Sequence, residues 1–246
     1  MLTPESSSTT SPFTSQRLGP WKIKGVDFVL FLSISFISIY LLSSITLKIY
    51  SGESELLPSI LSGYGLQFGA ILGFLAFSHL QQAPKTSRPC KPLEAIANGA
   101  VGMLLCYACL LLVAPLWKGL LDALQITYEP QDPVKMLMEG GTRLEMGLMY
   151  ALIVVAAPIG EELLFRAGIF RFLNGKMPLY ASVGISSIAF AAVHFNTYSF
   201  GPLFVLGAAM CLVYRKTGNI LSSITLHCLF NLTNLIFISF AQTLPQ

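Results

Sequence analysis

Long apolar runs separated by short polar stretches dominate the chain. Runs of about 18–25 predominantly apolar residues are long enough to cross the hydrocarbon core of a bilayer as α-helices. Seven such segments are predicted, at residues 26–47, 59–80, 93–116, 145–172, 178–196, 200–214 and 218–240. The fourth is longer than a minimal span, and Pro158 with Gly160 is expected to kink it. The pattern predicts an all-α, polytopic transmembrane helical bundle of about seven spans.

Composition supports a membrane protein. Charged residues make up 11% of the chain and apolar residues 54%, whereas an ordinary soluble domain is about 25% charged. A soluble fold of this length cannot bury that much apolar surface. We expect residues 1–25 to form a disordered cytoplasmic tail because they are rich in Ser and Thr. Residues 26–144 are expected to hold the N-terminal transmembrane helices and an exoplasmic loop, and residues 145–240 a C-terminal helical core.

Lysine and arginine are unevenly divided between the two sides that seven spans define. One side receives ten of them: Arg17, Lys22, Lys24, Lys85, Arg88, Lys91, Arg171, Lys176, Arg215 and Lys216. The other side receives four: Lys48, Lys118, Lys135 and Arg143. Because cytoplasmic loops carry an excess of Lys and Arg, this bias predicts a cytoplasmic N-terminus and an exoplasmic C-terminus. We expect a multi-pass protein of the bacterial inner membrane, with the lipid bilayer and not nucleic acid as its partner.

Two adjacent glutamates interrupt the fourth apolar segment. A charged side chain at the bilayer centre costs about 2.5–3.5 kcal/mol on insertion scales, so intramembrane acids are rare and usually functional. Glu162 and Arg166 are four residues apart and share a helix face, which predicts an ion pair. Glu161 points in another direction and has no partner within its own helix. Glu161 is therefore the candidate for general-base chemistry, and Glu162 for a structural role.

Two later apolar segments each carry a histidine. His194 lies near the end of the fifth segment, and His227 lies in the seventh, four residues before Asn231. That spacing places an imidazole and a carboxamide on one helix face. A single intramembrane histidine is more often an interhelical hydrogen-bonding group than a catalyst. A purely structural network, however, does not need an unpaired carboxylate together with two imidazoles, so the combination favours a reaction centre.

Three ordered motifs carry a family resemblance: Glu161-Glu162-x-x-x-Arg166, Phe190-x-x-x-His194 and His227-x-x-x-Asn231. Together they resemble the CPBP family of CAAX proteases and bacteriocin-processing enzymes (also called Abi), which includes the type II CAAX prenyl endopeptidases. The resemblance covers roughly residues 145–240. It implies an intramembrane endopeptidase with a catalytic cavity among the last four helices. Its substrate would be a membrane-associated peptide or protein, of the prenylated CAAX type or a leader peptide.

The resemblance also implies a role for each motif residue. Glu161 and His194 would activate the attacking water. His227 and Asn231 would stabilise the oxyanion, as an imidazole and an amide donor can. Glu162 and Arg166 would brace the site, and Phe190 would serve packing. No metal or other cofactor is favoured in this interpretation.

Three alternatives stay open. Glu161, His194 and His227 can be three ligands of a divalent metal such as zinc or cobalt, with water in the fourth position. The chain can instead be a non-catalytic immunity or scaffold protein that binds a peptide in its cavity. A transporter also uses buried carboxylates, but two histidines and an oxyanion-type asparagine serve it poorly. The natural substrate, the biological role and the oligomeric state do not follow from the sequence.

Overall fold

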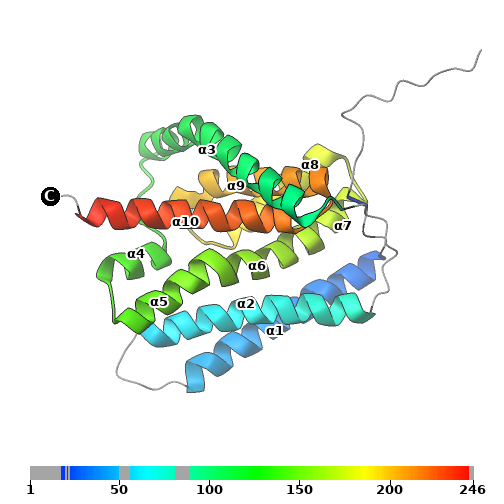
Figure 1. Ribbon diagram of the computed structural model, residues 1–246, viewed down its shortest axis with the longest axis horizontal. Helices are drawn as coiled ribbons and strands as arrows, with labels where there is room; N and C mark the ends of the chain where they lie inside the picture. Colours follow the sequence, from blue (N-terminus) through cyan, green and yellow to red (C-terminus); the bar gives the residue numbers. More distant parts are fainter. Residues whose placement is uncertain (1–17, 20, 22, 50–55, 81–88, 244–246) are drawn as a thin grey trace, which may run out of the picture.

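The structure, a computed structural model, describes residues 18, 19, 21, 23–49, 56–80 and 89–243. In this part of the chain every regular element is helical, and no strand occurs. The elements are α1 (Gly25–Ile49), α2 (Leu56–Leu80), α3 (Pro92–Ala123), α4 (Asp132–Glu139), α5 (Arg143–Ala151), η1 (Leu152–Ala156), α6 (Ala157–Glu162), η2 (Leu163–Phe170), α7 (Arg171–Asn174), α8 (Leu179–Ala192), α9 (Thr197–Thr217) and α10 (Leu221–Thr243). In Figure 1, α1 and α2 flank one side of the bundle and α3 the other, with α5–α7 and α10 between them.

The membrane architecture agrees with the apolar pattern. Within the described ranges, six helical stretches are long and apolar enough to cross a membrane, and α8 is a shorter apolar helix of 14 residues. All seven predicted segments are thus helical. The fifth differs in extent, because α8 ends at Ala192 instead of continuing to residue 196. Phe195 has a positive φ of 48°, and the Asn196 side chain caps the start of α9 by accepting from the Ser199 N–H.

The fourth span is one continuous helical path, Arg143–Asn174, with two changes of hydrogen-bond register. Thr142 and Glu145 form a capping box at its start. The π-helical segments η1 and η2 lie on either side of α6, which carries both glutamates. Pro158 is the second residue of α6, which directly follows η1. The structure thus has π-helical turns on either side of Pro158 and Gly160, and the expected kink at these residues stays a prediction.

Close packing of α1 against α2 fixes one wall of the bundle. Gly69 and Gly73 lie so near α1 that an added Cβ would approach Ile39 Cα to 2.5 Å and Ser35 Cα to 2.6 Å. Only glycine allows the two backbones to come this close. The opposite face of α2 presents Gln67, a buried polar side chain, towards the fourth span.

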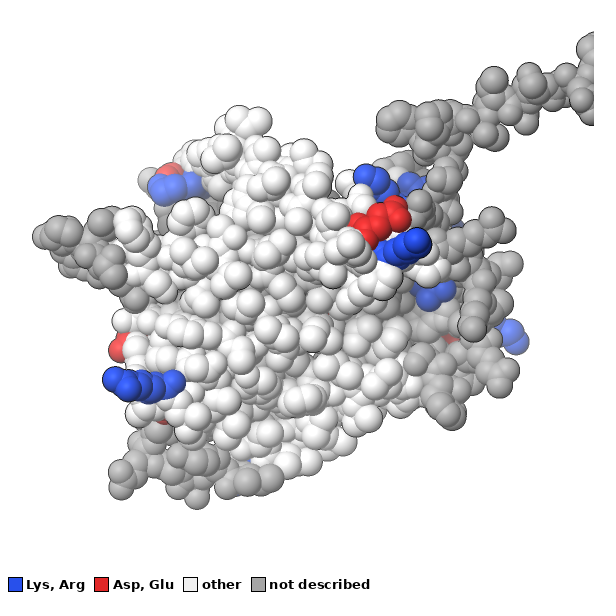
Figure 2. All heavy atoms as spheres, viewed as in Figure 1, with Lys and Arg blue, Asp and Glu red and all other residues white. Residues whose placement is uncertain are grey.

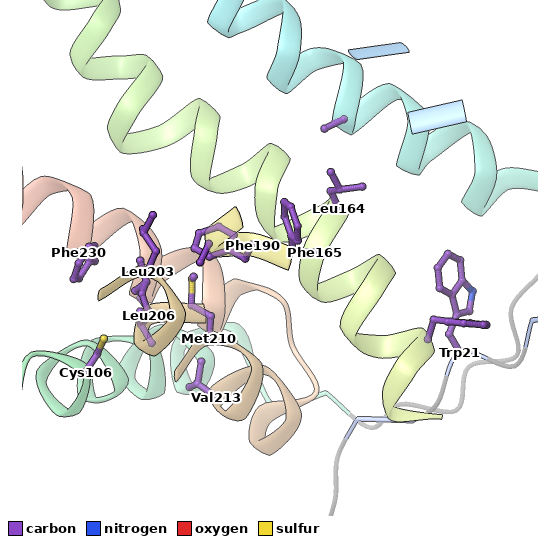
Figure 3. Packing of buried hydrophobic residues seen from close by; sticks show 14 of the residues in the cluster. Trp21, Cys106, Leu164, Phe165, Phe190, Leu203, Leu206, Met210, Val213 and Phe230 are labelled. Atoms are coloured by element: carbon purple, nitrogen blue, oxygen red, sulfur yellow. The ribbon is translucent and has the colours of Figure 1, made fainter. Parts of the chain in front are cut away.

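The residues just before α1 pack onto the bundle. Leu18, Trp21 and Ile23 are buried, and the Trp21 ring meets Phe31 and Phe77 edge-on at centroid distances of 5.3 and 5.5 Å. Figure 3 shows Trp21 beyond Phe165 and Leu164, near the end of the helical path that carries them. The packed region thus begins earlier than the expected tail boundary at residue 25. The rest of that tail, residues 1–17, 20 and 22, lies outside the described residues.

On the face that Figure 2 shows, charged side chains gather at the two ends of the molecule, and an uncharged band lies between them. One end joins the segments around Cys90, Arg171 and Thr217. The Cys90 N–H donates to the Thr217 carbonyl, and the Arg171 Nε to the Gly19 carbonyl. The opposite end contains α4, the end of α3 and the start of α9. This arrangement is the one expected of a bundle that crosses a bilayer.

Candidate active site

The four predicted catalytic residues border one cavity of about 720 Å³. Glu161 comes from α6, His194 from the turn after α8, and His227 and Asn231 from α10. Elements far apart in the sequence therefore bring the three motifs together. Most of the remaining wall is apolar, with contributions from α2, α4, α5, η1, α9 and α10. A concave, largely apolar site with a few convergent polar groups is typical of a ligand-binding or catalytic pocket.

Glu162 and Arg166 form the ion pair that their spacing predicts. Arg166 Nη1 lies 2.9 Å from Glu162 Oε1, and both side chains are fully buried. The guanidinium group also lies over the Phe190 ring, 4.2 Å from its centroid, which is a cation–π contact. Phe190 itself is fully buried. Glu162, Arg166 and Phe190 thus form a supporting layer behind the cavity, since none of the three borders it.

His227 lies between the two glutamates. Its Nδ1 is 3.1 Å from Glu162 Oε1, and its Nε2 is 3.8 Å from Glu161 Oε2. Because a carboxylate only accepts hydrogen bonds, the short contact assigns a proton to Nδ1. The longer separation exceeds a direct hydrogen bond. The sequence did not predict that Glu162 orients His227, because the two residues are 65 positions apart.

His194 occupies the position where α8 ends. Its Nδ1 lies 2.7 Å from the Phe190 carbonyl oxygen, one of the acceptors left free at a helix C-terminus. A carbonyl oxygen cannot donate, so Nδ1 carries the proton and, in the neutral ring, Nε2 keeps its lone pair. The Phe190 ring meets both imidazoles edge-on, with centroid distances of 4.9 Å to His194 and 5.7 Å to His227. Phe190 therefore spaces the two histidines.

Asn231 has a structural contact that its sequence position does not reveal. Its Nδ2 donates to the Ile153 carbonyl oxygen at 2.8 Å. In η1 the Ala157 N–H bonds to the Leu152 carbonyl. In this π register the carbonyl of Ile153 would be served by residue 158, and Pro158 has no N–H. Asn231 supplies the missing donor, and its second amide hydrogen is not used by this bond.

Gln67 is a site residue that the sequence analysis missed. It is buried on α2, and its Nε2 donates to Glu161 Oε1 at 3.4 Å. Gly160 permits this approach, because a Cβ there would lie 2.4 Å from Gln67 Oε1. Glu161 thus has one oxygen near Gln67 and the other near His227. The available signal was a single glutamine in an apolar span, placed between Gly65 and Gly69.

The short helix α4 covers part of the cavity. Leu137 is buried against Ile60, Met149 and Leu235, which anchors α4 to three other helices. An ion pair between Lys135 and Glu129 ties α4 to the preceding loop. The hydrogen bond from the Lys135 ammonium lowers the pKa of Glu129, and the same bond raises the pKa of Lys135. Sequence analysis predicted nothing catalytic here, and α4 contributes apolar wall and not chemistry.

The alternative of a metal centre was tested against the donor arrangement. Glu161, His194 and His227 all border the cavity. Within the described ranges, however, no group of three or more His, Cys, Asp or Glu side chains is arranged so that it could hold a metal ion. A divalent ion would need these donors to converge at about 2.0–2.2 Å from one point. In this arrangement the three side chains do not fit a metal site.

Residues 143–233 match the family model described as type II CAAX prenyl endopeptidase Rce1-like. Two curated proteins of Lactococcus lactis subsp. lactis (strain IL1403) are also similar to part of the chain. UPF0177 protein YbdI is 33% identical over 90 residues, which are 36% of this chain and 48% of that protein. UPF0177 protein YxdF is 35% identical over 83 residues, which are 33% of this chain and 45% of that protein. The chain spans about half the length of these relatives, and no solved structure matches it.

The matched region contains all three motifs that carry the resemblance to the CPBP family. It also contains the four predicted catalytic residues, all of which border the cavity, and the three predicted supporting residues behind them. The family match supports a membrane protease at the level of the family. The segment 143–233 is therefore similar to type II CAAX prenyl endopeptidases of the Rce1-like family model, in agreement with the resemblance of its motifs to the CPBP family.

Proposed function

We propose that this protein is an intramembrane endopeptidase that hydrolyses a peptide bond of a membrane-associated peptide. One observation carries the proposal: Glu161, His194, His227 and Asn231 reach the same cavity from three separate elements. The proposed location is the bacterial inner membrane, with the N-terminus in the cytoplasm. The family match supports the reaction class, and the charge distribution supports the orientation.

The charges of the site balance if His227 carries a proton on both ring nitrogens. Its Nδ1–H is used by Glu162, so only a second proton allows Nε2 to donate towards Glu161 or a substrate. Two carboxylates, one imidazolium and the Arg166 guanidinium then sum to zero. Buried charges within a membrane are tolerated when they are paired. We propose this protonation state for the resting site.

The reaction then follows from the free atoms of the site. A water held between Glu161 and the unprotonated Nε2 of His194 gives up a proton to one of them while its oxygen attacks the scissile carbonyl carbon. The oxyanion that forms accepts from His227 Nε2–H and from the second amide hydrogen of Asn231. The abstracted proton is passed to the amide nitrogen, and the C–N bond breaks to leave a carboxylic acid and an amine.

The test compares cells that express the native protein with cells that express Glu161→Gln. Glutamine keeps the shape of the side chain but cannot take a proton at neutral pH. Mass spectrometry of membrane peptides should reveal cleavage products that are absent with Glu161→Gln although the variant is inserted at the native level. Glu139→Gln, an identical exchange at an exposed position outside the cavity, is the matched control. Products that persist with Glu161→Gln would exclude Glu161 as the base.

A further inference from the structure

The lining of the cavity extends from the polar centre towards one end of the bundle. On α10 it runs from His227 towards the C-terminus of that helix, as far as Ile238. On the fourth span it runs from Glu161 back to Met149, and on α2 it includes the first turns from Ser59. These stretches all lead from the polar centre to the end of the molecule that contains α4 (Figure 1).

The opposite direction is blocked by tightly packed side chains. On the fourth span, Phe165, Arg166 and Phe170 follow the glutamates and are almost fully buried. On α10, Leu226 precedes His227 and is fully buried. Figure 3 shows Phe165 and Phe190 packed together on this side, with Trp21 further along. None of these residues borders the cavity, so among the described residues the lining of the cavity does not reach this end.

The two ends differ strongly in charge. The predicted span order assigns ten of the Lys and Arg residues and three acids, Glu5, Asp27 and Glu94, to the side of the blocked end. It assigns four Lys and Arg residues and seven acids to the side of the open end: Glu53, Glu55, Asp122, Glu129, Asp132, Glu139 and Glu145. Because Lys and Arg are enriched in cytoplasmic loops, the blocked end faces the cytoplasm and the open end faces the exoplasmic side.

We infer that the cavity receives its substrate from the exoplasmic side of the membrane. This inference rests on the proposed protease function and defines its substrate class. The substrate is a membrane-associated peptide whose scissile bond has already been moved across the bilayer, such as an exported peptide that remains attached to the membrane. A lipidated C-terminus that stays in the cytoplasm does not reach the catalytic residues, although the matching family model is named for prenylated CAAX substrates.

The first experiment measures which end of the protein is accessible from outside the cell. Asp132→Cys introduces a thiol at the open end, where the native side chain is 82% exposed. Lys176→Cys is the matched variant at the blocked end and is also exposed. A membrane-impermeant maleimide applied to intact cells should label Asp132→Cys. Lys176→Cys should show only the background of the unsubstituted protein until the membrane is opened. Labelling of Lys176→Cys alone, or of both variants, overturns the inference.

The second experiment locates the cleaved bonds. The peptides that appear only with active Glu161 are mapped onto the topology of the proteins from which they come. Cleavage at exoplasmic positions supports the inference, and cleavage at cytoplasmic positions overturns it while leaving the protease function intact. If no peptide depends on Glu161, the proposed function fails, and the labelling result still reports which way the cavity faces. The two failures are therefore distinguishable.

Discussion

Glu161 and Glu162 are neighbours in the chain, yet their surroundings give them different tasks. Glu162 is fully buried and contacts both Arg166 and His227. Glu161 borders the cavity and keeps 19% of its side-chain surface exposed. The helical spacing of Glu162 and Arg166 predicts their pairing, and the structure has it. The part played by Glu161 in catalysis stays a prediction, because geometry alone does not measure turnover.

Breaking the buried ion pair between Glu162 and Arg166 should lower the stability of the protein and change the shape of the cavity little, because neither residue borders it. Arg166→Met leaves Glu162 buried without its cation, and loss of one partner of a buried pair typically costs about 3–5 kcal/mol. We expect a clearly lower thermal midpoint in detergent, with reduced yield. The double variant Glu162→Gln/Arg166→Met removes both charges and should recover part of the loss. Equal destabilisation in the single and double variants would contradict a charge-based explanation.

Gln67 should act as a positioning residue for Glu161. Gln67→Met keeps the length of the side chain but removes the hydrogen bond to the carboxylate. Hydrogen bonds to charged groups contribute about 1.5–3 kcal/mol, which corresponds to a roughly 10- to 100-fold loss of turnover. Gln67→Glu places a second carboxylate beside Glu161 and should be more severe. Native turnover in Gln67→Met, measured on a peptide found with the native protein, would remove Gln67 from the site.

Metal dependence separates two mechanisms that use the same residues. If Glu161 and His194 act on water directly, exhaustive chelation should leave cleavage almost unchanged. If Glu161, His194 and His227 instead held a divalent ion, chelation would abolish cleavage and added zinc or cobalt would restore it. We expect activity to survive chelation, because the three side chains do not converge on one point. Metal content of the purified protein provides an independent measurement.

At the scale of helices, the site depends on the change from α-helical to π-helical hydrogen bonding in η1. A helical wheel, which assumes a regular α-helix, does not predict this change. The sequence predicts a disturbance near Pro158, and it also places His227 and Asn231 on one face. It does not indicate that η1 leaves the Ile153 carbonyl without a backbone donor, or that Asn231 supplies one. That contact joins residues 78 positions apart, and local propensity carries no information about it.

The structural role of Asn231 and its proposed catalytic role can be separated by a substitution at Pro158. Asn231→Ala removes the donor to the Ile153 carbonyl, and an unsatisfied buried acceptor costs about 1–3 kcal/mol. It also removes an oxyanion donor, a loss that typically lowers rate by about 10²–10³-fold. Adding Pro158→Ala restores a backbone N–H near the freed carbonyl. The double variant should regain thermal stability but not turnover. If turnover returned as well, Asn231 would be a structural residue only.

The end of α8 is a second place where sequence and structure differ. The apolar run predicts a span that continues to residue 196, whereas the helix stops at Ala192. The reason is local. The His194 side chain caps the helix end by donating from Nδ1 to the Phe190 carbonyl oxygen, and Phe195 turns the chain with a positive φ. Hydrophobicity alone cannot detect such an ending, because the residues around it remain apolar. The consequence is that His194 projects from a turn, where it reaches the cavity.

At the scale of the whole molecule, the sequence predicts the helical bundle from the length of its apolar segments. It also predicts how the charged residues divide between the two ends, because the positions of Lys and Arg in the loops determine this division. It does not predict the cavity, whose walls come from seven elements and include Gln67 on α2 and the covering helix α4. The second span, α2, which lies outside the family match, thus helps to shape the site. Its contribution arises from tertiary contacts such as the close approach of α1 and α2.

The crossing of α8 decides the topology of the C-terminal half. Its 14 residues rise about 21 Å, which is less than the roughly 30 Å of hydrocarbon. Two hydrogen bonds nevertheless tie the start of α9 to the far end of the bundle: Trp117 Nε1 donates to the Thr197 carbonyl, and Asn196 Nδ2 to the Glu129 carbonyl. The chain therefore completes the crossing through the turn at residues 193–196, and the number of crossings is odd.

Reporter fusions test this number directly. Fusions after Glu55 and after Gln246 should report the exoplasmic side, and fusions near Lys85 and Lys176 should report the cytoplasm, because ten of fourteen loop Lys and Arg residues lie on the side shared by the latter two. An alkaline phosphatase reporter is active only outside the cytoplasm, and a fluorescent protein that folds only in the cytoplasm provides the reciprocal signal at each position. If the fusion after Gln246 reported the cytoplasm while the fusion after Glu55 reported the exoplasm, α8 would be a re-entrant segment. The cavity would then need a different assignment of its open end.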